Sequence, residues 1–307
     1  MGSQSTTRQE SKSLKRLARS NKRYCFSAAY PPVLSIGPGE TLIVETNDAR
    51  SGTIHSSADL LSVPHPDGTN PVTGPIYVES ADPGDSLVVR VHEIAVEPRG
   101  YTAIKARIGL MAEQAAEFAT KIIPIEDGMV RFSDTVRFPS VPMIGTIGVA
   151  PAAGEISCLY PGTHGGNMDN KFVRAGCTLH LPVYVPGALL SMGDVHAAMG
   201  DGEVSMVGLE IASEITVTVD VAKGEFIERP WIELDGRWIT TGDDADAGVA
   251  MKIACAQMVS LMMKRLGLSF NDAYMLSSIG ADLAICQACD PGRFPVTTRM
   301  SYDFAAR

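Results

Sequence analysis

The sequence predicts a mainly β protein that ends in a pair of helices. Proline and glycine punctuate roughly the first 240 residues, and short β-branched runs lie between them. Several such runs without a clear helix between them favour sandwiches or barrels. The C-terminal part instead carries apolar residues at steps of three and four, which is the spacing of amphipathic helices.

Three segments have the composition of strands that begin after a turn. Thr41–Thr46 follows Gly37-Pro38-Gly39, and Ser86–His92 follows Asp82-Pro83-Gly84-Asp85. Glu214–Val219 alternates polar and β-branched residues, which is the period of a half-buried strand. We therefore expect these three segments in one or more antiparallel sheets.

The helical pair is predicted near the C-terminus. Ala245–Leu266 has the helical period, and Gly267 is a suitable C-cap. Ser269–Asp272 resembles a capping box that opens a second helix over Ala273–Cys286. A further candidate helix, interrupted by a glycine, covers Ile104–Ile123.

The composition limits the classes of partner. With 26 basic and 35 acidic residues, the net charge of −9 argues against nucleic acid, which needs a basic face for its phosphates. The same charge disfavours anionic membrane surfaces, and we find no apolar stretch of about 18 residues that would span a bilayer. A hydrophobic content of 45% over 307 residues permits one large domain or two modest ones.

The N-terminal segment and the cysteines predict a cytoplasmic protein. Residues 1–22 are polar and basic, unlike a secretory signal. The six cysteines are therefore expected to be reduced and mostly buried. Cys286 and Cys289 form a C-x-x-C pair, but the pair closes an apolar helical pattern, so burial is favoured over redox or zinc chemistry.

A polar, glycine-rich region is the strongest sign of a functional site. Residues 164–203 contain three Asp, one Glu, two His and one Asn within the segments His164–Asp169, Gly193–His196 and Gly200–Glu203. The pairs 167/169, 194/196 and 201/203 are two residues apart, so each pair shares one face of an extended chain. Such pairs suit a divalent-metal site, while turn-capping Asp and Asn remain an equal alternative.

Two other constellations are weaker. Glu45 and Asp48 end the Thr41–Thr46 segment, where a turn-forming Asp is the simpler interpretation. Cys177 and His180 could combine a thiol with a base, but catalytic pairs are rarely neighbours in sequence. The apolar residues after His180 favour a buried Cys177.

Taken in order, the motifs resemble the acetamidase/formamidase family of metal-dependent amide hydrolases. The resemblance extends from about Tyr24 to Gln287 and so covers most of the chain. The matching segments are residues 45–49, 70–78, 142–151, 165–169, 193–196, 200–203 and 272–277. Each segment alone is a weak signal, whereas the ordered set is specific.

The resemblance implies a mostly β fold with β-sandwich-like parts and a smaller α/β portion. Residues 21–307 are expected to form the catalytic region, either undivided or split into β subdomains with a C-terminal α/β part. Residues 1–20 are expected to be a flexible N-terminal extension. The implied reaction is hydrolysis of a short linear amide, acetamide or formamide, to a carboxylate and ammonia. The implied cofactor is a divalent metal, with zinc favoured over calcium.

The resemblance also implies roles for individual residues. The expected metal ligands are Asp48, Asp169, Asp194 and His196. Additional candidate ligands are His164, Asp201 and Glu45. Glu203 is expected to act as general base and then as acid to the departing amine, unless it is itself a ligand. Asn167 is expected to donate its amide N–H to the developing oxyanion.

Two alternatives to a short linear amide remain open from the sequence. The substrate could be a cyclic amide, a carbamate or a urea-like compound, because pocket size is not readable from the sequence. The protein could also be a non-catalytic β-sandwich module in which calcium shapes a binding surface. In the favoured interpretation the protein binds a small amide and neither nucleic acid nor a membrane. We also expect the enzyme to form a homo-oligomer.

Overall fold

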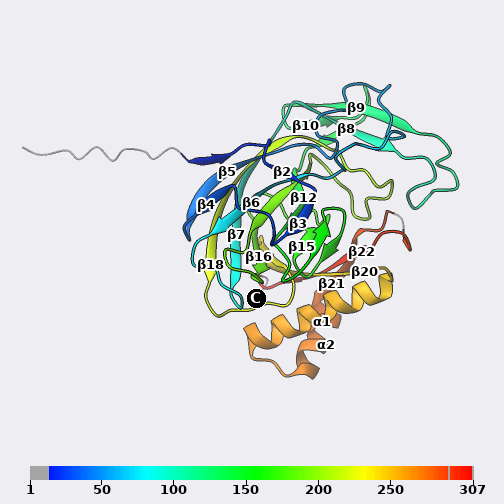
Figure 1. The fold of residues 1–307 in the computed structure, drawn as a ribbon. Coiled ribbons are helices and arrows are strands. Elements are labelled where there is room, and N and C mark those ends of the chain that lie inside the picture. The colour runs from blue at the N-terminus through cyan, green and yellow to red at the C-terminus, as the bar shows by residue number, and fades with distance from the viewer. Residues whose placement is uncertain (1–13, 290, 306–307) are drawn as a thin grey trace, which may run out of the picture.

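The computed structural model describes residues 14–289 and 291–305. Strands are its main secondary structure, and its two helices lie near the C-terminal end of the chain (Figure 1). The strands form two large sheets, a four-stranded sheet and a two-stranded pair. The predicted fold class, mainly β with a C-terminal helical pair and a smaller α/β portion, is confirmed.

The larger sheet has nine strands and includes all three segments predicted as strands. In spatial order the strands are β1 (Lys15–Leu17), β5 (Glu40–Thr46), β18 (Ser213–Ala222), β7 (Ser86–Val96), β16 (Thr178–Pro182), β19 (Trp231–Leu234), β20 (Arg237–Asp244), β22 (Val296–Asp303) and β21 (Ala281–Gln287). β5, β18 and β7 are neighbours and pair antiparallel. The alternation predicted for β18 is visible in its burial, since every second residue from Ser213 to Val219 is buried.

The second large sheet contains the site. Its strands are β14 (Pro161–Gly162), β15 (Gly165–Asn167), β12 (Met143–Gly148), β17 (Leu190–His196), β6 (Val72–Val78) and β2 (Lys22–Arg23), with β4 (Leu34–Ile36) paired to β6. β17 is central and is buried at all seven positions. A strand covered on both faces is an unusual place for ionisable residues, because each must find a partner there.

Two smaller sheets lie outside these. The four-stranded sheet consists of β11 (Arg137–Pro139), β10 (Met129–Arg131), β9 (Ala119–Glu126) and β8 (Arg99–Ile104). The two-stranded sheet pairs β13 (Glu155–Ser157) with β3 (Cys25–Ser27). In Figure 1 the four-stranded sheet lies at the top, far from the helices.

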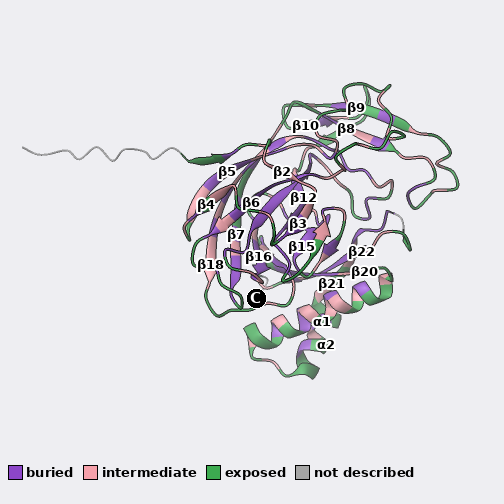
Figure 2. Ribbon diagram, viewed as in Figure 1, coloured by how far each residue is buried: buried purple, intermediate pink, exposed green. Residues whose placement is uncertain are grey.

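One hydrophobic core joins the two large sheets. Val44 of β5 and Val217 of β18 belong to the same buried cluster as Ile76 of β6, Ile147 of β12 and Val195 of β17. Figure 2 shows the inner strands of both sheets mostly in the colour of buried residues. The sheets therefore pack face to face around shared apolar side chains, as in a sandwich.

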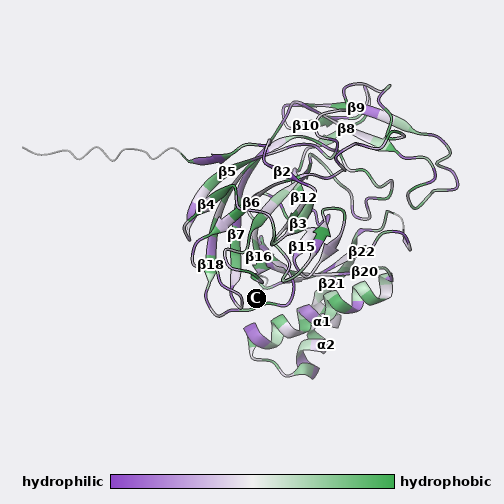
Figure 3. Ribbon diagram, viewed as in Figure 1, coloured by the Kyte–Doolittle hydropathy of each residue, from purple (hydrophilic) through white to green (hydrophobic). Residues whose placement is uncertain are grey.

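The first predicted helix is confirmed almost to the residue. α1 (Ala247–Leu266) begins at Asp246, whose side chain accepts a hydrogen bond from the Val249 amide. It ends at Gly267, which adopts a φ of 67° and so serves as the predicted C-cap. α1 packs on β20 and β22, and hydrophobic and hydrophilic residues are mixed along it (Figure 3).

The second helix is shorter than predicted. α2 (Phe270–Gly280) is capped by Ser269 as expected, but strand β21 replaces the helix from Ala281 to Gln287. β21 pairs antiparallel with β22, the next strand along the chain, which in turn pairs with β20. Pairing with the sheet thus overrides the local helical period, and Cys286 lies in a strand rather than at the end of a helix.

The candidate helix over Ile104–Ile123 is wrong. β8 ends at Ile104, turns follow, and β9 begins at Ala119. Arg107 and Gly109 have φ values of 64° and 103°, which a right-handed helix excludes. A Cβ at Gly109 would lie 2.9 Å from the Val204 carbonyl oxygen, so this position requires glycine in its turn.

The expected N-terminal extension, residues 1–20, falls partly on residues 1–13, which lie outside the described part of the chain. Beyond them, Lys15–Leu17 forms β1 and pairs parallel with β5. Within residues 14–289 and 291–305, no helix is long and apolar enough to cross a membrane.

Candidate functional site

Four carboxylates surround one histidine at the end of β17. Asp194 and His196 lie on this strand, two residues apart as the sequence pattern predicts. Asp169 follows β15, and Glu203 lies in the loop after β17. Glu210 reaches His196 through an isolated backbone bridge. All five residues are buried.

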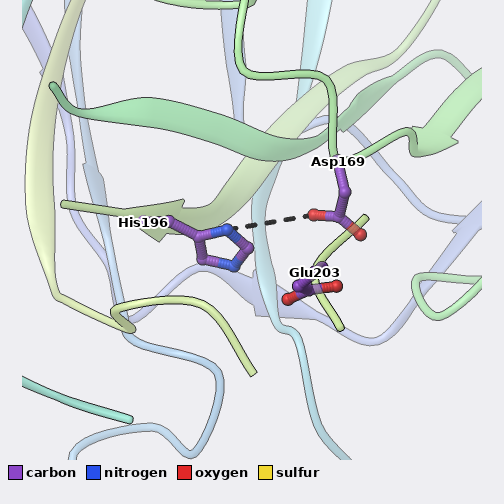
Figure 4. A group of neighbouring side chains, drawn as sticks. All are labelled: Asp169, His196 and Glu203. Carbon is purple, nitrogen blue, oxygen red and sulfur yellow. Dashed lines mark ion pairs between the residues drawn. The ribbon is translucent and has the colours of Figure 1, made fainter. Parts of the chain in front are cut away.

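The five side chains form two overlapping groups with the geometry of metal ligands. Asp169, His196 and Glu203 form one group, and Asp194, His196 and Glu210 form the other. Within each group the potential ligand atoms lie within 4.8 Å of one another. Figure 4 shows the first group, with the His196 ring facing the Asp169 carboxylate and Glu203 beside it.

His196 is the shared member because its two ring nitrogens face different carboxylates. Nε2 lies 3.2 Å from Glu210 Oε1 and 3.9 Å from Asp194 Oδ1. Nδ1 lies 4.0 Å from Asp169 Oδ1. Gly208 allows the ring this position, since a Cβ there would lie 2.7 Å from the imidazole.

The backbone at the site is strained. Asp169, Asp194 and Glu203 have φ values of 43°, 53° and 41°, in the left-handed region. Each such residue costs of the order of 1–3 kcal/mol and persists where surrounding contacts dictate the conformation. Strain at three of the four clustered acids indicates that the fold holds these carboxylates in place against local preference.

Neutral amides and one hydroxyl hold the outer oxygens of the acids. Asn70 Nδ2 donates to Asp194 Oδ2 at 2.8 Å. Gln287 Nε2 donates to Asp169 Oδ2 at 2.6 Å and to Glu203 Oε2 at 3.1 Å. Thr146 Oγ1 shares its single proton between Asn167 Oδ1 at 2.6 Å and Asp194 Oδ2 at 3.1 Å. These donors orient the carboxylates and leave other oxygens free.

The free ligand atoms are buried and unpaired. Among the described residues, four such atoms have no hydrogen-bond partner: Asp169 Oδ1, Asp194 Oδ1, Glu210 Oε2 and His196 Nδ1. Buried polar atoms of folded proteins are nearly always paired, so four orphans in one cluster require an explanation. A cation held by either group would satisfy the unpaired atoms of that group, and the donor set of oxygens plus imidazole fits a divalent ion.

Burial also makes the negative charge of the cluster costly. It raises the pKa of Glu203 to about 7, that of Asp194 to about 7 and that of Glu210 to about 8. Burial and the neighbouring Glu203 raise the pKa of Asp169 well above its usual range. The cluster therefore favours protons or a cation near neutral pH, as catalytic sites commonly do.

Asn167 lies at the edge of the cluster. Its Oδ1 accepts a hydrogen bond from Thr146 Oγ1 at 2.6 Å, and the residue lines the same cavity as the acids. Because the carbonyl end is engaged by Thr146, the amide NH₂ is directed to the other side. The structure thus brings together five of the predicted site residues, namely Asn167, Asp169, Asp194, His196 and Glu203.

Asp48 and Glu45 lie outside both metal-holding groups. The Asp48 carboxylate accepts hydrogen bonds from the backbone amides of Arg50 and Gly52, at 2.8 and 3.0 Å, so it stabilises its own turn. Glu45 pairs with Arg16 at 3.0 Å. Asp48 therefore forms the turn after β5, as the simpler interpretation of the sequence predicted.

His164 and Asp201 are also separate from the cluster. The His164 ring packs edge-on against Phe26 with centroids 5.0 Å apart, and burial lowers its pKa to about 4. Asp201 accepts two hydrogen bonds from Arg299, at 2.7 and 2.8 Å, and pairs with Lys171. Its pairing with these cations explains why it turns away from its sequence neighbour Glu203.

Three residues of the site were not identified from the sequence: Asn70, Glu210 and Gln287. Glu210 had a usable signal, because it is an acid inside the apolar run Val207–Ile211 and such an acid needs a partner when buried. Asn70 and Gln287 carry no such signal, since amides are common in turns and at strand ends.

The thiol–imidazole alternative has no support in the geometry. Cys177 is part of the main hydrophobic core, and burial raises the pKa of its thiol to about 12. The His180 ring stacks on Trp231, with centroids 3.9 Å apart. A thiolate nucleophile needs a depressed pKa, which is the opposite of what this core position produces.

The cluster forms the floor of a cavity of about 140 Å³. Apolar side chains contribute part of its wall, including Leu61, Leu159, Met206 and Phe294. Pockets for drug-sized ligands have roughly 300–1,000 Å³. The cavity therefore suits a ligand of few atoms with a polar group directed at the acids.

Comparisons with known proteins agree with the sequence motifs. The sequence model described as the Acetamidase/Formamidase family matches residues 12–157 and 152–291. The acetamidase of Mycolicibacterium smegmatis is 23% identical, and the match covers 80% of this chain and 82% of that protein. The formamidase of Methylophilus methylotrophus is 26% identical over 63% of this chain. The chain spans about three fifths of the length of its curated relatives from Methylophilus methylotrophus and Schizosaccharomyces pombe (62% and 61%).

A solved structure shows the same fold. The crystal structure of acetamidase from Bacillus halodurans superposes with a TM-score of 0.91 at 36% sequence identity. The match covers 95% of this chain and 98% of that one. Together with the family match, this confirms the resemblance: the chain belongs to the acetamidase/formamidase family.

Proposed function

We propose that this protein is a metal-dependent amidase that hydrolyses short linear amides to a carboxylate and ammonia. The observation that carries the proposal is the buried group of four acids and His196 with unpaired ligand atoms at the floor of a small cavity. The names of the relatives, acetamidase and formamidase, support the choice of amide. The volume of about 140 Å³ supports a substrate of few atoms.

The residues that would hold the metal are those of the two groups around His196. An imidazole nitrogen among the donors favours zinc, whereas an all-oxygen set would favour calcium. A divalent ion there would polarise an amide carbonyl and lower the pKa of water. The site residues that stay in the proposal are Asp169, Asp194, His196 and Glu210, with Glu203 either as a further ligand or as the base.

Glu203 is our candidate for proton transfer. Its pKa of about 7, raised by burial, suits a group that accepts a proton from water and returns it to the departing amine. Gln287 holds one carboxylate oxygen of Glu203 through its side-chain amide, so the other oxygen is available for this exchange. Asn167 is our candidate for stabilising the oxyanion, because Thr146 engages its carbonyl end and leaves the N–H groups for substrate.

The remaining predictions concern the state of the protein in the cell. We infer a homo-oligomer located in the cytoplasm, as is common for enzymes of this size. Light scattering coupled to size-exclusion chromatography tests the assembly, because a monomer has a mass of 32.7 kDa.

Ammonia release from acetamide and formamide is the direct test. It is measured on the purified protein, after chelation, and after addition of zinc or calcium. We expect activity to be lost on chelation and restored by zinc. Release that survives complete metal removal would contradict the metal dependence. Failure to hydrolyse either amide while the metal is bound would redirect the proposal to cyclic amides, carbamates or urea-like substrates.

A further inference from the structure

Two cationic side chains line the same cavity as the acid cluster. Arg50 follows β5, and Lys105 follows β8. Arg50 donates from Nη2 to the Val63 carbonyl at 2.7 Å, while its Nε is buried without a hydrogen-bond partner among the described residues. Within the same part of the chain, Lys105 has neither an ion pair nor a hydrogen bond from its ammonium group.

Cations elsewhere near this cavity are paired, which makes these two distinctive. Arg299 and Lys171 both bind Asp201. Among residues 14–289 and 291–305, neither Arg50 nor Lys105 pairs with an acid, although four carboxylates line the same cavity. An anion that enters the cavity would therefore find two cationic donors available.

Burial separates the two ends of the cavity. The four acids are between 1% and 8% exposed, so they lie at its deepest part. Arg50 and Lys105 are half-buried and so lie closer to solvent. A ligand that satisfies both ends has a neutral polar group for the acids and an anionic group for the cations. The walls between, which include Leu61, Met206 and Phe294, suit a short carbon chain.

We propose that the preferred substrates are short amides that carry a carboxylate at the far end of the acyl chain, with Arg50 and Lys105 binding that carboxylate. This inference rests on the proposed amidase function and names its substrate class. Malonamate and succinamate are the simplest members of the class. In the reaction, the water oxygen forms a C–O bond to the amide carbon and the C–N bond breaks. One proton of the water leaves with the nitrogen as ammonia, and the other is released when the new carboxyl group ionises. The product is a dicarboxylate.

A different role for the two cations is to offset the charge of the acid cluster. That role does not distinguish an anionic amide from a neutral one of the same shape. Malonamide is the neutral counterpart of malonamate, because an NH₂ group replaces the carboxylate oxygen. The ratio of the two affinities therefore separates substrate binding from general electrostatic balance.

Calorimetric binding to the Glu203→Gln protein is the primary experiment, since turnover is expected to be blocked there. We expect malonamate to bind at least about tenfold more tightly than malonamide, as one desolvated charge-assisted contact provides. Lys105→Met and Arg50→Met should each bring the ratio close to one, and Lys105→Arg should retain most of it. Lys252→Met is the matched control, because Lys252 is an exposed lysine on α1.

A second measurement keeps the test valid if the Glu203→Gln variant folds poorly. It is the ratio of kcat/KM for malonamate to kcat/KM for malonamide, measured on proteins that keep Glu203. The preference should appear mainly in KM, because the contact is made equally in the bound state and the transition state. Equal affinity and equal kcat/KM for the two compounds would overturn the proposal. If acetamide is hydrolysed in that case, the amidase function stands and only the substrate class fails. If malonamate binds selectively without turnover, the anion site stands and the amidase function fails.

Discussion

Two histidines on inner strands, His196 of β17 and His180 of β16, show what distinguishes a site from a core position. His196 has carboxylates within 4.0 Å of both ring nitrogens. His180 stacks on Trp231 with the ring planes 4° apart, and burial lowers its pKa to about 4. His180 Nε2 has a single carboxylate nearby, that of Glu233 at 3.9 Å, so burial together with Arg265 and Arg90 keeps this imidazole neutral and packed. Burial among several acids creates a place for a cation.

The strongest test of this comparison replaces each histidine. We expect His196→Asn to lose the metal and to reduce amide hydrolysis by about a thousandfold or more, since metal assistance contributes several kcal/mol. His180→Asn should leave kcat/KM within about threefold, because this residue lies outside both metal-holding groups. Metal content by elemental analysis and ammonia release are the readouts. Equal losses in the two variants would refute the distinction.

Glu203 sharpens the comparison by separating chemistry from metal binding. Glu203→Gln should reduce kcat by about 10²–10⁴-fold, the usual contribution of a general base, while the bound metal remains. The measurement is ammonia release together with metal content on the same sample. Loss of the metal in this variant would assign Glu203 as a ligand and leave the base unidentified.

The amides behind the acids should have smaller effects. Gln287→Met removes the donor to Asp169 and Glu203, and we expect metal affinity to fall by about 10–100-fold. Gln257→Met is the control, since Gln257 is a half-buried residue of α1 whose side chain bonds Glu228 away from the acid cluster. Affinity is measured by competition with a chelator. Unchanged affinity in the Gln287 variant would show that the carboxylates do not need this orientation.

The smallest expected effect concerns the packed histidine and pH. The pKa of His180 is about 4 in the folded protein, against an ordinary value of 6.5. The unfolded chain therefore binds a proton below pH 6.5 that the folded chain does not, so stability falls as the pH drops from 6.5 to 4. The loss is at most about 3 kcal/mol. His180→Phe keeps a ring on Trp231 and removes this contribution.

Urea unfolding at pH 7, 5.5 and 4 measures the effect. The free energy of unfolding should decline less steeply for His180→Phe than for the unaltered protein. His164, whose pKa burial also lowers to about 4, should continue to contribute in both proteins. Parallel curves for the two proteins would show that His180 is not the residue responsible.

Local sequence patterns predicted the secondary structure correctly where the conformation of a helix or strand is decided by its own residues. The caps at Gly267 and Ser269 and the alternation in β18 are examples, because the hydrogen bonds and the burial they require are local. The prediction was wrong at residues 281–286 and over Ile104–Ile123. There pairing with the following strand, β22, and a turn with positive φ at Arg107 decided the conformation.

The same division holds for the site. The sequence by itself singled out acids and imidazole and two pairs that the structure brings to one cavity, 167/169 and 194/196, because residues two apart on an extended chain share a face. Only the tertiary structure decided that Glu210 reaches Asp194 and His196. It also decided that Gln287 binds Asp169 and Glu203 and that Asp201 turns away to Arg299. The physical reason is that these contacts cross between strands far apart in sequence. Their partners are set by sheet register and core packing, which no short segment encodes.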